Sequence, residues 1–110
     1  MKHGLYIIGV ALLLLTSCER QQAKSTIRDF VEAHIDSDAD LLEFSVLDST
    51  HVISDSLLDA MRSQNTADYA TRKDSKLLFM RVRYLSGVDT CSATFYLNPD
   101  LEDVVAYKKN

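Results

Sequence analysis

An unbroken apolar run from Leu5 to Leu15 is the feature that most limits what this 110-residue chain can fold into. A helix needs roughly 20 apolar residues to cross a hydrocarbon core of about 30 Å, so the run is too short to span a membrane. A run of this length after a positive residue, here Lys2, is typical of the core of a signal peptide. We therefore expect one small domain, formed by the residues that follow the run.

The run ends in the sequence Leu15-Thr16-Ser17-Cys18, which resembles the lipobox of bacterial lipoproteins. In that motif small side chains let the backbone enter a peptidase cleft, and the cysteine thiol accepts a diacylglyceryl group. The resemblance implies cleavage before Cys18 and several acyl chains, such as palmitate, on that residue, and such chains together anchor a protein durably. The run length and the spacing favour this interpretation over an uncleaved membrane helix or an ordinary secretory signal.

The motif also divides the chain. Residues 1–17 are predicted to be a lipoprotein signal peptide. Residues 18–25 are polar and lack an apolar pattern, so we expect a solvated, lipidated tether there. Residues 26–110 would then form a single globular domain, which at this size buries a modest core.

The residue counts exclude several kinds of site. Once residues 1–17 are removed, Gly87 is the only glycine, and Cys91 is the only cysteine besides Cys18. Phosphate-binding loops, dinucleotide fingerprints and nucleophile elbows need glycines at fixed spacings that this sequence lacks. We predict no disulfide within the chain, no cofactor and no metal.

An amphipathic helix is predicted at the start of the domain. Apolar residues recur at helical spacing between Ile27 and Ile35, with Ser25 or Thr26 as the N-terminal cap. The helix should end in residues 36–40, because short polar side chains there compete with the backbone for hydrogen bonds.

The remaining pattern predicts a second, shorter helix and an antiparallel sheet. The helix begins at Ser54-Asp55 and extends towards Tyr69. Strands are predicted at residues 42–47, 76–85, 90–97 and 104–107, with a hairpin turn at 86–89. This order describes an α+β domain in which helices pack on a small antiparallel sheet that ends in a three-stranded meander. The nearest fold analogy is cystatin-like, although the inhibitory loop of cystatins has no counterpart here.

The alternation along these strands assigns their faces. In the first strand Leu42, Phe44 and Val46 alternate with Glu43, Ser45 and Leu47. The core face of the central hairpin is predicted to carry Leu78, Met80, Val82, Tyr84, Cys91, Ala93, Phe95 and Leu97. The opposite face must be wet or covered by a partner, and it carries Leu77, Phe79, Arg81, Arg83, Leu85, Thr90, Ser92, Thr94 and Tyr96.

Several of these segments together look like small lipoproteins of Bacteroidota, a group without an assigned function. The likeness rests on the lipobox, the acidic turn after the first helix, the segment Phe44-Ser45-Val46-Leu47-Asp48-Ser49 and the closing segment Phe79 to Tyr107. It covers most of the chain. Its motifs are structural, so the resemblance implies no catalytic residue.

Acidic residues dominate the first half of the domain. Nine of them, and no lysine or arginine, lie between Arg28 and Arg62. Asp36, Asp38 and Asp40 alternate as at the start of a calcium loop, but Leu41 and Leu47 stand where that loop needs glycine and glutamate, so we do not expect calcium binding. The acidic residues either keep the surface soluble, which is the commoner role, or form a surface that docks a basic partner.

Basic residues provide a second candidate surface. Arg81 and Arg83 share one strand face, and Arg72, Lys73 and Lys76 lie close together in the sequence. Such residues are usually solvated, but guanidinium groups also bind carboxylates and phosphates. We do not expect nucleic acid as a partner, because the formal net charge is −4.

Two histidines and one cysteine are the other candidates for chemistry in the domain. His34 lies on the apolar face of the first helix, where a half-buried core histidine is favoured over a catalytic base. His51 lies in a connection and has no second ligand at metal spacing. Cys91 lies on an apolar strand face, which favours a buried, inert thiol over a reactive one.

The sequence therefore favours a non-enzymatic accessory lipoprotein of the cell envelope that binds a protein or a glycan. The alternative is an inhibitor or immunity lipoprotein that blocks a basic effector through its acidic surface. We predict an outer-membrane location that faces the periplasm, because Glu19 alone after the cysteine is a weak signal for surface export. The expected partners are the membrane, through Cys18, and an envelope protein or glycan.

Overall fold

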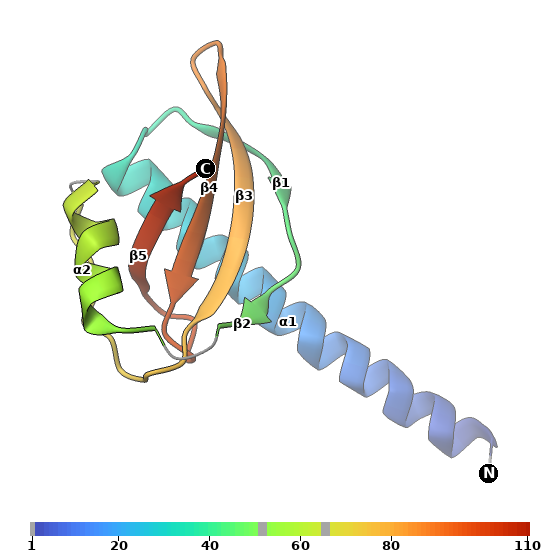
Figure 1. The fold of residues 1–110 in the computed structure, drawn as a ribbon. Coiled ribbons are helices and arrows are strands. Elements are labelled where there is room, and N and C mark those ends of the chain that lie inside the picture. Colours follow the sequence, from blue (N-terminus) through green and yellow to red (C-terminus); the bar gives the residue numbers. More distant parts are fainter. Residues whose placement is uncertain (1, 51–52, 65–66) are drawn as a thin grey trace.

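The computed structural model describes residues 2–50, 53–64 and 67–110. Its elements are α1 (Lys2–His34), β1 (Asp40–Phe44), β2 (Asp48–Ser49), α2 (Asp55–Gln64), β3 (Leu78–Ser86), β4 (Asp89–Leu97) and β5 (Val104–Lys109). All strands are antiparallel, in the order β1-β3-β4-β5, and β2 also pairs with β3 (Figure 1). The predicted α+β class and the β3-β4-β5 meander are confirmed.

Helix α1 differs most from the prediction at its N-terminal side. The helix runs without a break through residues 18–25, so neither Ser25 nor Thr26 is a cap and this segment is not a solvated tether. The segment is rich in alanine, glutamine, lysine, arginine and glutamate, which favour helix, and it holds no glycine or proline. Ala23 is fully buried, so the packed domain includes residues that the sequence assigned to the tether.

The main core lies between α1 and one face of the sheet, which we call the inner face. Ile27, Phe30 and Val31 of α1 pack with Val82 and Phe95 of the central strands. The ring centroids of Phe30 and Tyr107 lie 5.6 Å apart, and Tyr107 also stacks on Phe95 at 5.5 Å. This apolar contact is what holds α1 diagonally across the sheet (Figure 1).

Strand β1 does not follow the predicted alternation. Leu42 is 47% exposed and Val46 73% exposed, while Leu41, Phe44 and Leu47 pack against the core. The register shifts between Leu41 and Glu43, where a bulge adds one residue and changes the phase of the strand. A bulge leaves no signal in a strict two-residue pattern, so the prediction for Leu42 and Val46 was wrong.

The central hairpin agrees with the prediction in register and face. Leu78 pairs with Leu97 and Ser86 with Asp89, and the turn places Gly87 at a φ of 62°, which favours glycine. Two residues of the predicted core face, Leu78 and Cys91, are only half-buried. Cys91 lies near the hairpin end of β4, where it pairs with Tyr84.

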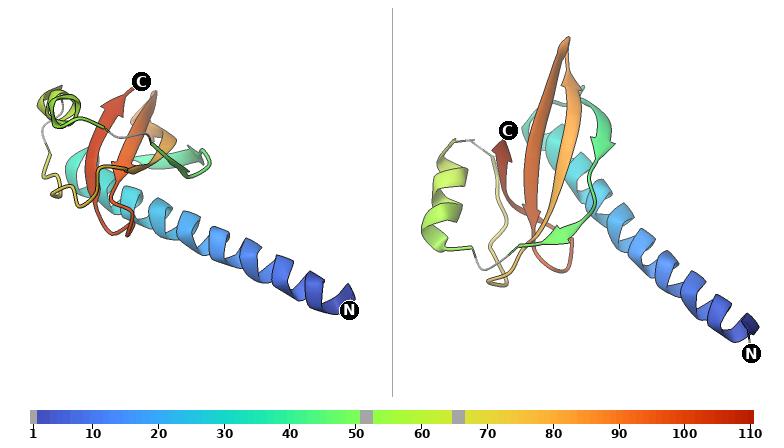
Figure 2. Two further views of the ribbon diagram at one scale, coloured as in Figure 1. Left: turned by 60° about the horizontal axis from the view of Figure 1, so that its bottom comes forward. Right: turned by 45° about the vertical axis from the view of Figure 1, so that its right-hand side comes forward.

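Helix α2 is shorter than predicted and covers part of the opposite face, which we call the outer face. It ends at Gln64, so Tyr69 lies outside it, and the Ser54 hydroxyl caps its first turn by accepting the Leu57 N–H at 3.2 Å. Leu58 and Met61 pack on Val105 and Ala106 of β5 in a second small core. The two helices thus lie on opposite sides of the sheet (Figure 2).

Arg62 secures α2 to the sheet edge. Its Nε donates to the Val105 carbonyl at 3.0 Å, and its Nη2 donates to the Ala70 carbonyl at 2.8 Å. These bonds satisfy two carbonyl oxygens that would otherwise be partly buried beside β5 without a hydrogen-bond donor. Helix α2 therefore covers the outer face over Val105 and Ala106 of β5, and it leaves Arg81 of β3 and Lys108 of β5 exposed.

Candidate functional site

The open part of the outer face carries two rows of residues that the register brings together. Phe79 pairs with Tyr96 across β3 and β4. In the next row Arg81 pairs with Thr94, and Thr94 pairs with Lys108 of β5. Residues directly opposite each other in an antiparallel sheet point to the same side, so both rows face outward.

Together with Ser49 and Thr50, these rows form a groove of about 450 Å³, which we call the outer-face groove. Its lining includes Phe79, Arg81, Thr94, Tyr96, Lys108 and Asn110. Among the described residues that line it there are two cationic side chains and no aspartate or glutamate side chain. On a chain with a formal net charge of −4, this is a local concentration of positive charge.

Arg81 is held by its backbone and leaves its side chain available. Its N–H donates to the Ser45 hydroxyl and its carbonyl accepts from the Ser45 N–H, both at 2.8 Å. Within residues 18–50, 53–64 and 67–110, neither the Arg81 guanidinium nor the Lys108 ammonium takes part in an ion pair. Arg83, in contrast, pairs with Glu43 at 3.1 Å.

The rest of the groove supplies aromatic faces and neutral polar groups. The ring centroids of Phe79 and Tyr96 lie 6.2 Å apart at an interplanar angle of 39°. The Thr94 hydroxyl donates to Asn110 Oδ1 at 3.3 Å, and Asn110 Nδ2 donates to the Ser92 hydroxyl at 3.0 Å. The groove can therefore offer charge to an acid group, an apolar ring face and hydrogen bonds to hydroxyls.

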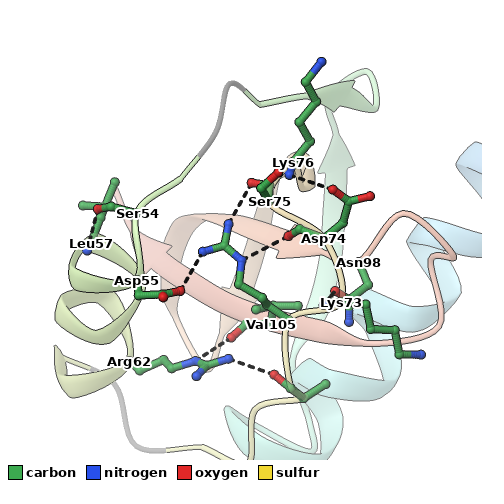
Figure 3. Close-up of polar contacts among 12 residues, drawn as sticks. Ser54, Asp55, Leu57, Arg62, Lys73, Asp74, Ser75, Lys76, Asn98 and Val105 are labelled. Carbon is green, nitrogen blue, oxygen red and sulfur yellow. Dashed lines mark hydrogen bonds and ion pairs between the residues drawn. The ribbon is translucent and has the colours of Figure 1, made fainter.

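A second open cavity, also of about 450 Å³, lies between α2 and the loop before β3, but its arginine is occupied. Arg72 binds Asp55 Oδ1 at 3.1 Å and the carbonyls of Asp74 and Ser75 at 3.0 and 2.7 Å (Figure 3). Its side chain is 16% exposed. Arg72 therefore holds the loop to α2, and binding a ligand would cost these contacts.

Lys73, from the same loop, is likewise paired. Its ammonium lies 2.8 Å from an Asp100 carboxylate oxygen and 3.7 Å from one of Asp103. The hydrogen bond that Lys73 donates to the Asp100 carboxylate raises the pKa of Lys73, and the same bond lowers the pKa of Asp100. Asn98, which is fully buried, also accepts the Lys73 N–H at 2.8 Å. Of the predicted basic residues, only Arg81 both lines the outer-face groove and has no ion pair among the described contacts.

The predicted acidic site residues lie at the far end of α1. Asp36 accepts the Ser86 hydroxyl at 2.6 Å and the Asp38 N–H at 2.9 Å, and these bonds lower the pKa of Asp36. Asp38 and Asp40 are exposed in the turn and at the start of β1. Asp36 therefore serves the structure, by tying the end of α1 to the β3–β4 hairpin.

The larger acidic segment does not form one surface. Its residues are distributed over α1, β1, β2 and α2, and the two helices lie on opposite sides of the sheet. Glu43 and Asp55 are also neutralised by ion pairs with Arg83 and Arg72. The sequence alone could not show that these acidic residues lie on opposite sides of the sheet, because they form one continuous acidic stretch along the chain.

The remaining candidates differ in their surroundings. His34 is half-buried at the end of α1, 4.9 Å from the Phe30 ring centroid, as a core histidine would be. His51 lies outside the described residues. No group of three or more histidine, cysteine, aspartate or glutamate side chains in the described part of the chain is arranged to hold a metal ion.

Cys18 is exposed on α1. Among the described residues, no helix combines the length and the apolar character needed to cross a membrane. The structure thus presents the thiol at the surface of a helix that is continuous with the domain.

Comparisons with known proteins give no relative from which a role could be transferred. The chain matches no family model, no curated protein and no solved structure significantly. The cystatin-like analogy therefore has no structural neighbour to support it.

Sequence reasoning found part of the groove. The alternation along residues 76–85 and 90–97 predicted that Phe79, Arg81, Thr94 and Tyr96 share one face, as they do. It missed Lys108, because the prediction ended the last strand at Tyr107 and the structure extends β5 to Lys109. The alternation of Ala106 and Lys108 along an extended strand was the signal that could have found it.

Proposed function

We propose that this chain is a lipid-anchored accessory protein of the bacterial cell envelope, without enzymatic activity, that binds an acidic ligand in its outer-face groove. The ligand would be a glycan or a protein segment that carries carboxylate or phosphate groups. The observation that carries the binding part of the proposal is Arg81, without an ion pair among the described residues, beside Lys108 in a groove lined by no aspartate or glutamate side chain. The lipobox at Leu15–Cys18 supports the anchor.

The chemistry of the groove matches such a ligand. A guanidinium group binds carboxylates and phosphates through paired hydrogen bonds, which gives direction as well as attraction. The Phe79 and Tyr96 rings provide an apolar surface of the kind on which a sugar ring or an aliphatic side chain can pack. Location in the periplasm at the outer membrane, in a Bacteroidota-like envelope, remains part of the proposal.

The inhibitor or immunity alternative has less support. It needs the acidic residues to form one exposed surface, and these residues lie on both sides of the sheet. Asp36, moreover, uses its carboxylate within the fold.

The anchor is tested by replacing Cys18 with serine in cells that express the full chain. We expect Cys18→Ser to lose incorporation of labelled palmitate and to leave the membrane fraction, while Cys91→Ser, the matched control, remains lipidated and membrane-bound. Membrane retention with normal signal cleavage in Cys18→Ser would contradict the proposal.

The groove is tested by reversing charge on two surfaces. The lipidated full chain, in detergent micelles, is applied to immobilised polygalacturonate and to immobilised polyglutamate. The first polymer represents an acidic glycan and the second an acidic peptide. We expect binding that weakens with salt and is lost in Arg81→Glu but kept in Arg28→Glu, which changes an exposed arginine on α1. Binding to neither polymer, or an equal loss in both variants, would count against the groove.

A further inference from the structure

The first residues after the anchor position are packed against the domain. Arg20 Nη2 donates to the Phe44 carbonyl at 3.0 Å, and Gln22 Nε2 donates to the Asp100 carbonyl at 3.2 Å. Ala23 is fully buried, and the Thr26 hydroxyl donates to the Leu101 carbonyl at 2.6 Å. Contacts with the domain therefore begin two residues after Cys18.

This short separation fixes the distance between anchor and domain. Two residues of helix rise about 3 Å. A flexible tether of the eight residues 18–25 would have an average end-to-end distance of about 15 Å. If Cys18 carries acyl chains, as the proposed function requires, the domain has no free chain with which to leave the bilayer surface.

The exposed side of α1 shows that the helix does not lie flat on the membrane. Cys18 precedes the buried Ile27 by about two and a half turns, so the two residues point to opposite sides of α1. Apart from Ala33, the exposed residues that share the outward side are polar or charged, and they include Gln21, Ser25, Arg28, Asp29 and Glu32. A helix that rests in the interface needs apolar side chains on the side that meets the lipid.

One end of the sheet is consequently close to the anchor. The loop that contains Asp100 and Leu101 contacts Gln22 and Thr26, and it follows directly from the Leu97 end of β4. Because Leu97 pairs with Leu78 and Leu78 with Ser49, β2 lies at the same end. This end comprises β2 and residues 98–103, and we call it the anchor end.

The opposite end lies far from the anchor. Asp36, just beyond α1, binds Ser86 at the hairpin end of β3. From Cys18 to His34 the helix rises about 24 Å, and β3 spans a similar length of about 26 Å. The hairpin tip at Val88 and the acidic residues Asp38 and Asp40 are thus remote from Cys18.

We infer that the folded domain sits directly on the membrane surface, with its anchor end facing the lipid head groups and its hairpin tip pointing away. This inference rests on the proposed lipidation of Cys18. It follows that the outer-face groove, on the side of the domain, meets ligands that lie at the membrane surface. Because the domain cannot move away from the bilayer, a ligand would have to come to the membrane surface in order to bind.

The test places a fluorophore at each end of the lipidated full chain. In a Cys91→Ser background, Ser49→Cys labels the anchor end and Val88→Cys labels the hairpin tip, where Val88 is 94% exposed. The proteins are reconstituted in phosphatidylcholine vesicles that contain a lipid with a nitroxide on its head group. We expect several-fold stronger quenching of the label at position 49 than of the label at position 88.

A matched variant removes the short separation between Cys18 and the packed domain. About twelve glycine and serine residues are inserted between Glu19 and Arg20, which leaves the lipobox and the domain intact. Quenching at the two positions should then become nearly equal. Equal quenching without the insertion overturns the inference while leaving the anchor in place. An unmodified mass for Cys18 with no binding to vesicles overturns both the anchor and the inference.

Discussion

The two faces of strands β3 and β4 have different roles. On the inner face, Met80, Val82 and Phe95 are fully buried under α1. One residue along, on the outer face, Phe79 is half-buried and Arg81 is exposed. The inner face stabilises the fold through apolar burial, and the open part of the outer face contributes little to that burial. Residues on the outer face can therefore be selected for binding.

Removing one aromatic ring from each face should separate the roles of the two faces most clearly. Phe95→Ala should lower the free energy of unfolding by about 3–5 kcal/mol, because it leaves a cavity beside Phe30 and Tyr107. Phe79→Ala should cost about 1 kcal/mol, because its ring is already partly in water. Urea unfolding followed by circular dichroism measures both values. Similar losses would show that the two faces share the stabilising role.

A second comparison concerns the inward and outward sides of α1 near the anchor. Ala23→Glu should lower the free energy of unfolding by about 2 kcal/mol or more, because it buries a charge at a fully buried position. Ser25→Glu, two residues away and exposed, should change it by less than about 0.5 kcal/mol. If Ala23→Glu is also neutral, residues 18–25 do not pack on the domain and form the tether that the sequence suggested.

Helices and hairpins were accessible from the sequence because their patterns are local. The apolar residues from Ile27 to Val31 and the alternation in β3 and β4 predicted both the elements and their inward faces. The start of α1 was not accessible, because a polar helical segment and a polar tether have the same composition. Only the contacts of Arg20 and Gln22 with distant residues distinguish the two.

A smaller effect is expected from the polar contact at the end of α1. The hydrogen bonds from Ser86 and from the Asp38 N–H lower the pKa of Asp36 from its ordinary value of 3.8. Because the folded pKa is the lower one, this contact adds stability above about pH 4 and loses it as the pH falls through the folded pKa. Unfolding of the parent chain should therefore become easier on acidification below about pH 4, and Asp36→Asn should show a flatter profile. Asp38→Asn is the control, and a profile flattened to the same extent in both variants would contradict this role of Asp36.

The candidate site was only half accessible from the sequence. Strand alternation placed Arg81 on an outer face, but it could not show that Glu43 neutralises Arg83 while Arg81 has no such partner among the described residues. Pairing of this kind depends on which strands are neighbours, and β1 lies about 40 positions before β3 in the sequence. Arg83 is paired and Arg81 is not because of which strand lies next to β3 in the sheet.

Stability and binding can be measured on one variant that removes both cations of the outer-face groove. In Arg81→Ser combined with Lys108→Ser, the free energy of unfolding should stay within about 0.5 kcal/mol of the parent, because neither cation has a partner among the described contacts. The affinity of the lipidated chain for polygalacturonate or polyglutamate, whichever polymer the parent binds, should fall about tenfold or more, because both cations of the groove are removed. An unchanged affinity, or a loss of stability comparable to that of Phe95→Ala, would contradict the assignment of the outer face to binding.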